Sequence, residues 1–243
     1  MNYDNWAKVY DLIYGSNKDD VNFYQNEAKK VKGKVLEIGC GTGRIYLELL
    51  KEGVDAYGID LSPKMLESLK EKAKKLGLKP KIKKTDMKSF KLRNKFSLII
   101  IPFRAFLHNL TTEDQIQTLK NIKRHLPSNG RLILNFFFPN YEIMASHYNK
   151  QVKRNIKTKS GNLLLYEKAR FADEPNQIIN GTTTILNNNK KIWSGKVKLA
   201  LVYKKEFELL LRSAGFKKWK VYGGFDYQPL KSSKQEMVWL IQN

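Results

Sequence analysis

A glycine-rich loop directly after a short hydrophobic run is the feature that most constrains the fold of this chain. The run KVLEIG (34–39) predicts a β-strand, and the loop that follows places glycine at positions 39, 41 and 43 before a helical segment. Glycine lets the chain turn sharply there and lets a ligand approach the main chain without interference from a Cβ atom. The sequence therefore predicts a ligand-binding turn between a strand and a helix.

Hydrophobic runs alternate with amphipathic segments along the first half of the chain. The predicted strands are 34–39, 55–60, 79–86, 96–102 and 131–138. Ser62 and Gly77 bound one of the intervening helices, and Thr112 with Gln115 forms a capping-box pattern for a helix over 113–126. This alternation is typical of an α/β fold whose parallel sheet is covered by helices on both faces.

Residues 140–202 follow a different pattern, with more asparagine, threonine and lysine. Segments 162–171 and 178–186 alternate polar and apolar residues, and a predicted turn of three asparagines follows at 187–189. We expect an antiparallel β insertion here, which acts as a lid or as a dimer interface. The chain then returns to the core sheet in 203–243 with a helix and two last strands.

Composition narrows the class of protein. The 243 residues include a single cysteine, Cys40, which excludes an intrachain disulfide and a multi-cysteine zinc site, so no metal is predicted. The sequence has no apolar stretch long enough to cross a bilayer and does not open with a signal-peptide pattern. We expect a cytoplasmic protein without a membrane partner, as a monomer or a homodimer.

A formal net charge of +22 is the one compositional feature that points to nucleic acid or another anionic surface. The lysines are spread over almost every segment, which is more typical of surface solvation than of one binding face. We therefore treat a nucleic-acid partner as possible but not favoured.

Three acidic residues follow three successive predicted strands. Glu37 precedes the first glycine by two positions, where it would attract a cationic group and repel a pyrophosphate. Asp60 ends the second strand about 20 residues later, the spacing at which a carboxylate accepts hydrogen bonds from ribose hydroxyls. Asp86 ends the third, where it would accept from an adenine amino group between Leu61 and Met87. A nicotinamide enzyme is the alternative, but its third glycine would come one residue later, at position 44.

These motifs resemble those of the class I (Rossmann-like) S-adenosylmethionine (SAM) dependent methyltransferases of the small-molecule type. The segments that carry the likeness are VLEIGCGTGR (35–44), YGIDLSPKML (57–66) and KTDMKSF (84–90). The resemblance implies a SAM-binding core over 34–139 and a seven-stranded sheet whose last strand is antiparallel. It also implies SAM as the cofactor, with S-adenosylhomocysteine as the product. The implied cofactor-binding residues are Tyr14, Glu37, Gly39, Cys40, Gly41, Gly43, Asp60, Leu61, Asp86, Met87 and Pro102.

The resemblance extends to the ends of this core. YDLIYG (10–15) is similar to a segment that other members fold over the donor, which implies a helical segment at 1–33 above the cofactor with Tyr14 contacting cofactor or substrate. The N/D-P-P-Y/F motif of nucleic-acid amino methyltransferases is absent, because residues 101–104 read IPFR. Pyrimidine C5 methylation is disfavoured because the only cysteine, Cys40, lies inside the donor loop.

The acceptor side has two candidate catalytic residues. His108 is placed to act as a general base, although a structural histidine is the competing interpretation. Arg104 suits an anionic acceptor, although a structural ion pair competes. Four aromatic residues on one predicted helical face either pack on the core or place a ring beside the donor; they are Tyr3, Trp6, Tyr10 and Tyr14.

Together these features predict methyl transfer from SAM to a nitrogen or oxygen nucleophile of a small molecule. An RNA (tRNA or rRNA) or protein methyltransferase is the alternative, supported by the net charge alone. A SAM-binding regulator without catalytic activity is a third hypothesis, which tight donor binding without turnover would distinguish.

Overall fold

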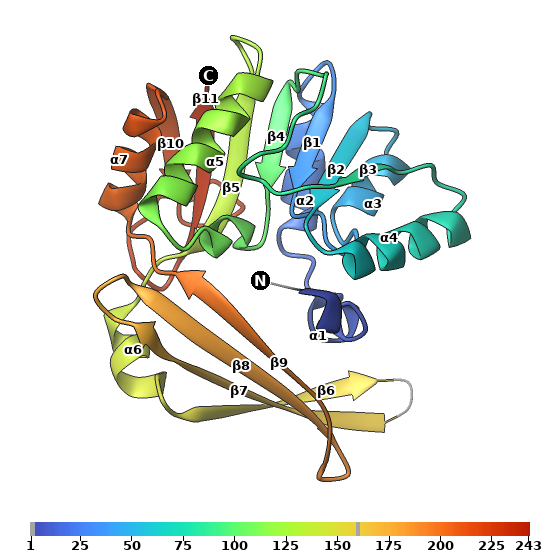
Figure 1. Ribbon diagram of the computed structural model, residues 1–243, viewed down its shortest axis with the longest axis vertical. Coiled ribbons are helices and arrows are strands. Elements are labelled where there is room, and N and C mark those ends of the chain that lie inside the picture. The colour runs from blue at the N-terminus through green and yellow to red at the C-terminus, as the bar shows by residue number, and fades with distance from the viewer. Residues whose placement is uncertain (1–2, 159–160) are drawn as a thin grey trace.

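Two β-sheets organise residues 3–158 and 161–243, the part of the chain that the computed structural model describes (Figure 1). The larger sheet has seven strands in the order β10-β11-β5-β4-β1-β2-β3. Its strands are parallel except β11, which runs antiparallel to both β5 and β10. This arrangement confirms the predicted α/β fold with a mostly parallel seven-stranded sheet.

The strands of the larger sheet follow the predicted runs closely. Their bounds are Val35–Ile38 (β1), Ala56–Asp60 (β2), Lys81–Lys84 (β3), Leu98–Ile101 (β4), Arg131–Phe137 (β5), Lys218–Tyr222 (β10) and Glu236–Gln242 (β11). Every residue of β1 and β4 is buried, as expected for central parallel strands covered on both faces. The third strand is shorter than the predicted 79–86, because the Asp86 side chain accepts from the backbone N–H of Lys88 and turns the chain away.

Helices cover both faces of this sheet. On one face α5 (Thr112–His125) and α7 (Lys204–Ser213) enclose an apolar cluster that includes Phe207 and Trp239. On the other face lie α2 (Val21–Lys29), α3 (Tyr46–Lys51) and α4 (Pro63–Lys75). No helix in the described ranges is long and apolar enough to cross a membrane.

The capping residue of α4 is the predicted one, and that of α5 is not. Ser62 caps α4, its hydroxyl accepting from the Met65 N–H at 3.2 Å, as predicted. For α5 the predicted cap at Thr112 is wrong: Thr111 is the capping residue and accepts from the Asp114 N–H at 3.2 Å. The reason is conformational, since Thr111 has an extended backbone whereas Thr112 is already helical.

The insertion after β5 forms the smaller sheet. Its elements are α6 (Tyr141–His147), β6 (Gln151–Thr158), β7 (Gly161–Asp173), β8 (Ile178–Asn187) and β9 (Lys190–Ala200). The four strands pair antiparallel in chain order, which confirms the predicted antiparallel insertion. The predicted asparagine turn joins β8 to β9, with positive φ angles at Asn188 and Asn189 that suit a tight hairpin.

The segment before α2 lies between the two sheets (Figure 1). It consists of the 3₁₀ turn Tyr3–Asn5 (η1), a further turn and the short helix α1 (Tyr10–Tyr14). Trp6 is buried against the smaller sheet, with its ring 4.7 Å from that of Trp193. The segment therefore joins the insertion to the core.

A buried ion pair fixes the far end of this segment to the glycine loop. The Arg44 guanidinium donates to both carboxylate oxygens of Asp20, at 2.5 and 2.7 Å, and the two side chains are 10% and 3% exposed. Arg44 follows the last glycine of the loop, so the pair ties the entry to α2 to the turn after β1.

We expect Asp20→Asn to lower the free energy of unfolding by about 3–5 kcal/mol, because it leaves the Arg44 charge buried without its partner. Urea denaturation followed by circular dichroism measures this. The matched control is Asp55→Asn, whose partner Lys81 is 53% exposed and whose loss should cost about 1 kcal/mol or less. Equal losses in the two variants would contradict the importance of the buried pair.

Candidate active site

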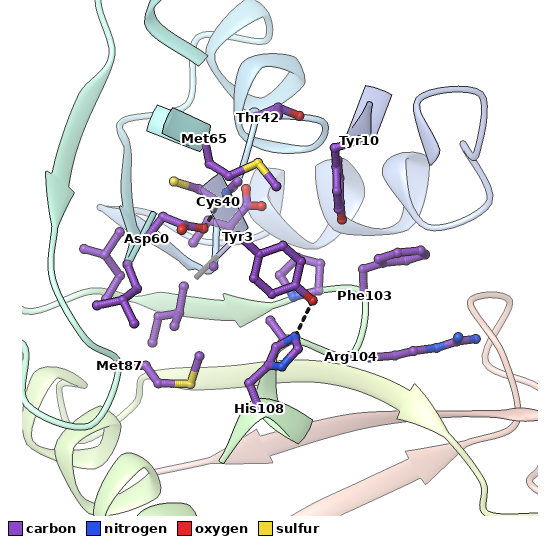
Figure 2. A pocket seen from close by; sticks show the side chains of 18 of the residues that line it. Tyr3, Tyr10, Cys40, Thr42, Asp60, Met65, Met87, Phe103, Arg104 and His108 are labelled. Carbon is purple, nitrogen blue, oxygen red and sulfur yellow. Dashed lines mark hydrogen bonds between the residues drawn. The ribbon is translucent and has the colours of Figure 1, made fainter. Parts of the chain in front are cut away.

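A cavity of about 290 Å³ lies where the carboxyl ends of β1, β2 and β4 meet (Figure 2). The core contributes the glycine loop, the end of β2, the loop after β3 and the turn after β4. The segment Tyr3–Tyr14 and strand β9 contribute the remaining walls, the latter through Val197 and Leu199. The cavity therefore lies between the larger sheet, the segment before α2 and the insertion.

The glycine loop forms one wall because its backbone is left-handed. Gly39 and Gly41 line the cavity with φ of 73° and 51°, and a Cβ on Gly39 would lie 2.9 Å from the Cβ of Ala105. Gly43 is outside the cavity lining; a Cβ there would meet Leu47 and Leu69 at 2.9 Å. Packing against Leu47 and Leu69 thus explains why position 43 requires glycine. Gly39 and Gly41, in contrast, leave the main chain open to a ligand.

Glu37 presents a carboxylate to this cavity from the middle of the core. The residue is 3% exposed, and its Oε2 atom has no hydrogen-bond partner among the described residues. Burial raises the pKa of this carboxyl well above its usual range, although the charge of Arg44 acts in the opposite direction. A buried acid without a partner is costly, so the site suits a ligand that brings a cationic group or a hydrogen-bond donor.

Asp60 lies at the end of β2 and holds the glycine loop in place. Its Oδ2 accepts from the Gly41 N–H at 2.9 Å and its Oδ1 from the Ser62 N–H at 2.8 Å. Burial raises the pKa of Asp60, although both backbone donors oppose the shift. Each carboxylate oxygen retains a second lone pair for a ligand hydroxyl.

Asp86, Leu61 and Met87 line the same cavity. Asp86 lies in the loop after β3, because β3 ends at Lys84. The Met87 sulfur accepts from the Asn109 side chain at 3.3 Å, which fixes the thioether at the cavity wall. Of the remaining predicted cofactor residues, Tyr14, Cys40 and Pro102 also line the cavity.

The turn after β4 has an unusual backbone that sequence reasoning did not anticipate. Phe103 and Arg104 both have positive φ angles, 51° and 70°. Asn135 on β5 holds them: its Oδ1 accepts from the Phe103 N–H at 2.9 Å and its carbonyl accepts from the Arg104 N–H at 3.1 Å. Asn135 also accepts from the Tyr24 hydroxyl and donates to Glu236. The signal in the sequence was a lone asparagine inside a hydrophobic strand.

Arg104 is part of a structural ion pair. Its guanidinium lies 3.6 Å from Glu236 and over the ring of Phe137, at 5.1 Å from the ring centre. Its Nε atom is buried without a hydrogen-bond partner in the described part of the chain. The structural ion pair that competed with acceptor binding for Arg104 is therefore present. A contact between Arg104 and an acceptor stays a prediction.

His108 ends the 3₁₀ turn Ala105–His108 (η2) and points into the cavity (Figure 2). Its Nε2 lies 2.7 Å from the Tyr3 hydroxyl and its Nδ1 lies 3.1 Å from the carbonyl oxygen of Lys198 on β9. Burial lowers the pKa of His108 to about 4, so the ring is neutral at physiological pH. The predicted base is thus connected to the segment before α2 and to the insertion, which the sequence did not reveal.

The aromatic series of the first segment lines one side of the cavity. All four residues predicted to share a helical face reach it, although the segment is broken into two short helical turns; they are Tyr3, Trp6, Tyr10 and Tyr14. Trp6 is almost fully buried, as expected for packing. The Tyr14 ring lies 5.2 Å from that of Phe103 and 5.1 Å from that of Tyr10, so it continues the aromatic wall to the turn after β4.

The described side chains offer little for metal or thiol chemistry. Residues 3–158 and 161–243 contain no group of three or more histidine, cysteine or acidic side chains that could hold a metal ion. Burial raises the pKa of the Cys40 thiol well above its usual range, so the thiol stays protonated. Cofactor binding through polar side chains and main chain is the chemistry that this cavity supports.

The core of the chain is similar in sequence to known methyltransferases. Residues 35–130 match a family model described as a methyltransferase domain. Curated relatives include a putative methyltransferase of Bacillus subtilis and the dTDP-3-amino-3,4,6-trideoxy-alpha-D-glucopyranose N,N-dimethyltransferase of Streptomyces venezuelae, each 29% identical. The matches cover 55% of this chain and 54% and 58% of those relatives, so the chain spans a little over half of their length.

The whole chain is also similar to solved structures. A SAM-dependent methyltransferase from Clostridium acetobutylicum superposes with a TM-score of 0.78 at 18% identity, covering 99% of this chain and 98% of that one. At this identity the likeness shows the fold, including the insertion as well as the core.

Glu37→Gln should stabilise the ligand-free protein, and more so at higher pH. A free glutamate has a pKa of about 4.3, and burial raises the pKa of Glu37 above it. Between these values the folded state holds one more proton than the unfolded state, so this group lowers stability as pH rises. Glutamine removes that loss.

Thermal unfolding at pH 5 and pH 8 measures the effect, with about 2–4 °C expected for each kcal/mol regained. The control Glu67→Gln changes an exposed glutamate on α4 and should give no pH-dependent gain. An equal gain for Glu37→Gln at both pH values would show that ionisation of Glu37 is not the cause.

Proposed function

We propose that this chain is a class I SAM-dependent methyltransferase, which binds SAM in the cavity described above and transfers the methyl group to a nitrogen or oxygen atom of a small molecule. The observation that carries the proposal is the buried Glu37 carboxylate, whose Oε2 has no partner in the described part of the chain and which lines the same cavity as Asp60 and Asp86. Three acids around one cavity suit a ligand with a cationic end, ribose hydroxyls and a base amino group.

The residues present fit the parts of SAM. Glu37 would hold the ammonium group, whose donors satisfy the orphaned oxygen. Asp60 would accept from the ribose hydroxyls through the lone pairs that Gly41 and Ser62 leave free. Asp86 would accept from the adenine amino group, with Leu61 and Met87 beside the ring. The open main chain at Gly39 and Gly41 would allow close approach of the methionine part.

Bound SAM supplies a methyl group on a positively charged sulfur, which is already a good leaving group. The protein's contribution is therefore mainly alignment and exclusion of water. The aromatic wall and the turn fixed by Asn135 shape the space opposite the three acids. The aromatic faces of Tyr10 and Tyr14 would also stabilise a cation in that space.

A small acceptor is supported by how the cavity is covered. The segment Tyr3–Tyr14 and the residues Val197 and Leu199 of β9 close it from the side opposite the core, so we assign the insertion the role of a lid. A folded RNA or a protein surface would need a broader opening beside the donor. The curated relative from Streptomyces venezuelae is named as acting on an amino sugar, which supports an amine as the nucleophile.

SAM should bind this protein with micromolar-order affinity, and NAD should not compete. Asp60→Ala should weaken SAM binding by about 1.5–3 kcal/mol, because two charge-assisted hydrogen bonds to the ribose are lost. Isothermal titration calorimetry measures both, with Asp55→Ala as a control outside the cavity. Unchanged affinity in Asp60→Ala would reject the assignment of Asp60 to the ribose.

The acceptor class is tested by supplying SAM labelled in its methyl group together with three fractions of a cell extract: small molecules, total RNA and protein. We expect label in the small-molecule fraction, because the covered cavity admits a compact acceptor. Asp60→Ala at subsaturating SAM serves as the control for donor-dependent transfer. Label that enters RNA or protein instead would reverse the ranking of acceptors, and tight SAM binding without any transfer would indicate a regulator.

A further inference from the structure

We propose that Tyr3 and His108 form a proton-accepting pair, in which the Tyr3 hydroxyl contacts the acceptor nucleophile and passes a proton to His108. The inference deepens the proposed function and rests on it. It makes Tyr3 the catalytic residue and His108 the group that acts through it. The sequence pointed to His108 alone and gave Tyr3 only as a member of an aromatic series.

The two side chains meet inside the cavity, where Figure 2 shows the Tyr3 hydroxyl directed at the His108 ring. The oxygen lies 2.7 Å from Nε2, and the ring centres are 5.1 Å apart with their planes at 80°. Tyr3 comes from the segment before α2 and His108 from the turn after β4. The pair therefore forms only when this segment is packed on the core.

The hydrogen-bond partners of His108 determine the direction of proton transfer. Nδ1 lies 3.1 Å from the Lys198 carbonyl oxygen, and a carbonyl cannot donate, so the proton of the neutral ring is on Nδ1. Nε2 then has a free lone pair, and Tyr3 is the donor in the 2.7 Å contact. Burial keeps both groups neutral, since it lowers the pKa of His108 and raises that of Tyr3.

Three residues next to Tyr3 hold its position from both sides. Asp4 accepts from the Ser62 hydroxyl at 2.6 Å at the start of α4. Asn5 donates to the Ser194 carbonyl and its own carbonyl accepts from the Trp193 indole, each at 3.0 Å on β9. Trp6 packs against the Trp193 ring. The hydroxyl of Tyr3 is thus preorganised, as a group that transfers a proton must be.

The oxygen of Tyr3 has a lone pair available for a second hydrogen bond, which the N–H or O–H of an acceptor can donate. In the transfer, the lone pair of the acceptor atom forms the bond to the methyl carbon, and the carbon–sulfur bond breaks with its electrons going to sulfur. The acceptor atom loses its proton to the Tyr3 oxygen, and the Tyr3 proton moves to Nε2 of His108. The ring then carries the proton until solvent removes it.

Other titratable groups at the cavity are less suited to this task. Glu37 is assigned to the ammonium group of the donor, and Asp60 and Asp86 accept from backbone N–H groups. The pKa of Lys88 is raised, first by its hydrogen bond to Asp114, so its amine stays protonated. Among these neighbours, the imidazole has an accepting lone pair that is already directed at a cavity hydroxyl.

The test uses Tyr3→Phe and His108→Ala in the full chain. The acceptor is a fresh, unlabelled sample of the small-molecule fraction into which the wild type transfers label. Tyr3→Phe keeps the ring and removes only the hydroxyl. We expect kcat to fall about 100-fold or more in both variants, as for loss of a general base. The KM for the acceptor and the Kd for SAM should stay within about threefold. Imidazole added to the buffer should restore part of the activity of His108→Ala and none to Tyr3→Phe.

The matched controls are Tyr166→Phe, on the face of β7 opposite Leu165, and His147→Ala, at the exposed end of α6. Both should keep wild-type activity. Wild-type kcat in Tyr3→Phe, or a loss in His108→Ala that appears in SAM binding and not in kcat, would overturn the pair while leaving methyl transfer intact. A wild-type protein that transfers no methyl group to any fraction would overturn the proposed function, and the pair with it.

Discussion

The left-handed backbone of the glycine loop is the constraint on which the rest of the site depends. The chain leaves β1 with positive φ at Gly39, Gly41 and Gly43, and neighbouring side chains occupy the space that a Cβ would need at Gly39 and Gly43. This turn brings Gly41 under the carboxylate of Asp60, which in turn fixes the entry to α4 through Ser62. Two neighbouring parallel strands are thus joined at their carboxyl ends by one side chain, and the cavity forms at that edge.

Acidic side chains line the cavity of a protein whose overall charge is strongly positive. The chain carries a formal net charge of +22, yet the side chains around the cavity include three carboxylates. One of them, Glu37, is buried with an oxygen that finds no hydrogen-bond partner in residues 3–158 and 161–243. Arg44 lies close by but is occupied by Asp20 in a bidentate pair. Lys88 and Arg104 also line the cavity and lie near Asp114 and Glu236. The Glu37 carboxylate is therefore the charged group at the cavity that is suited to a cationic ligand.

Features that depend on neighbouring residues were predictable, and those that depend on distant contacts were not. The strands, the antiparallel insertion and the three acids follow from local patterns, because strand ends in a parallel sheet share one edge. The role of Asn135 in holding Phe103 and Arg104 was hidden, since it links residues from two strands. The α5 cap was misplaced by one residue because two adjacent threonines carry the same signal.

The contact between Tyr3 and His108 shows the same limit, because their partners are far apart in the chain. Asn5 meets Ser194 across 189 residues, and Trp6 packs where β7, β8 and β9 have already assembled. The segment Tyr3–Tyr14 therefore reaches its final place only after the residues around Ser194 have been synthesised. Contacts of such high sequence separation form slowly. The strands β1, β2 and β4 that line the cavity can pair before β9 exists, whereas the cavity wall formed by Tyr3–Tyr14 and β9 cannot. Packing of the segment Tyr3–Tyr14 over the cavity is therefore a late event in folding.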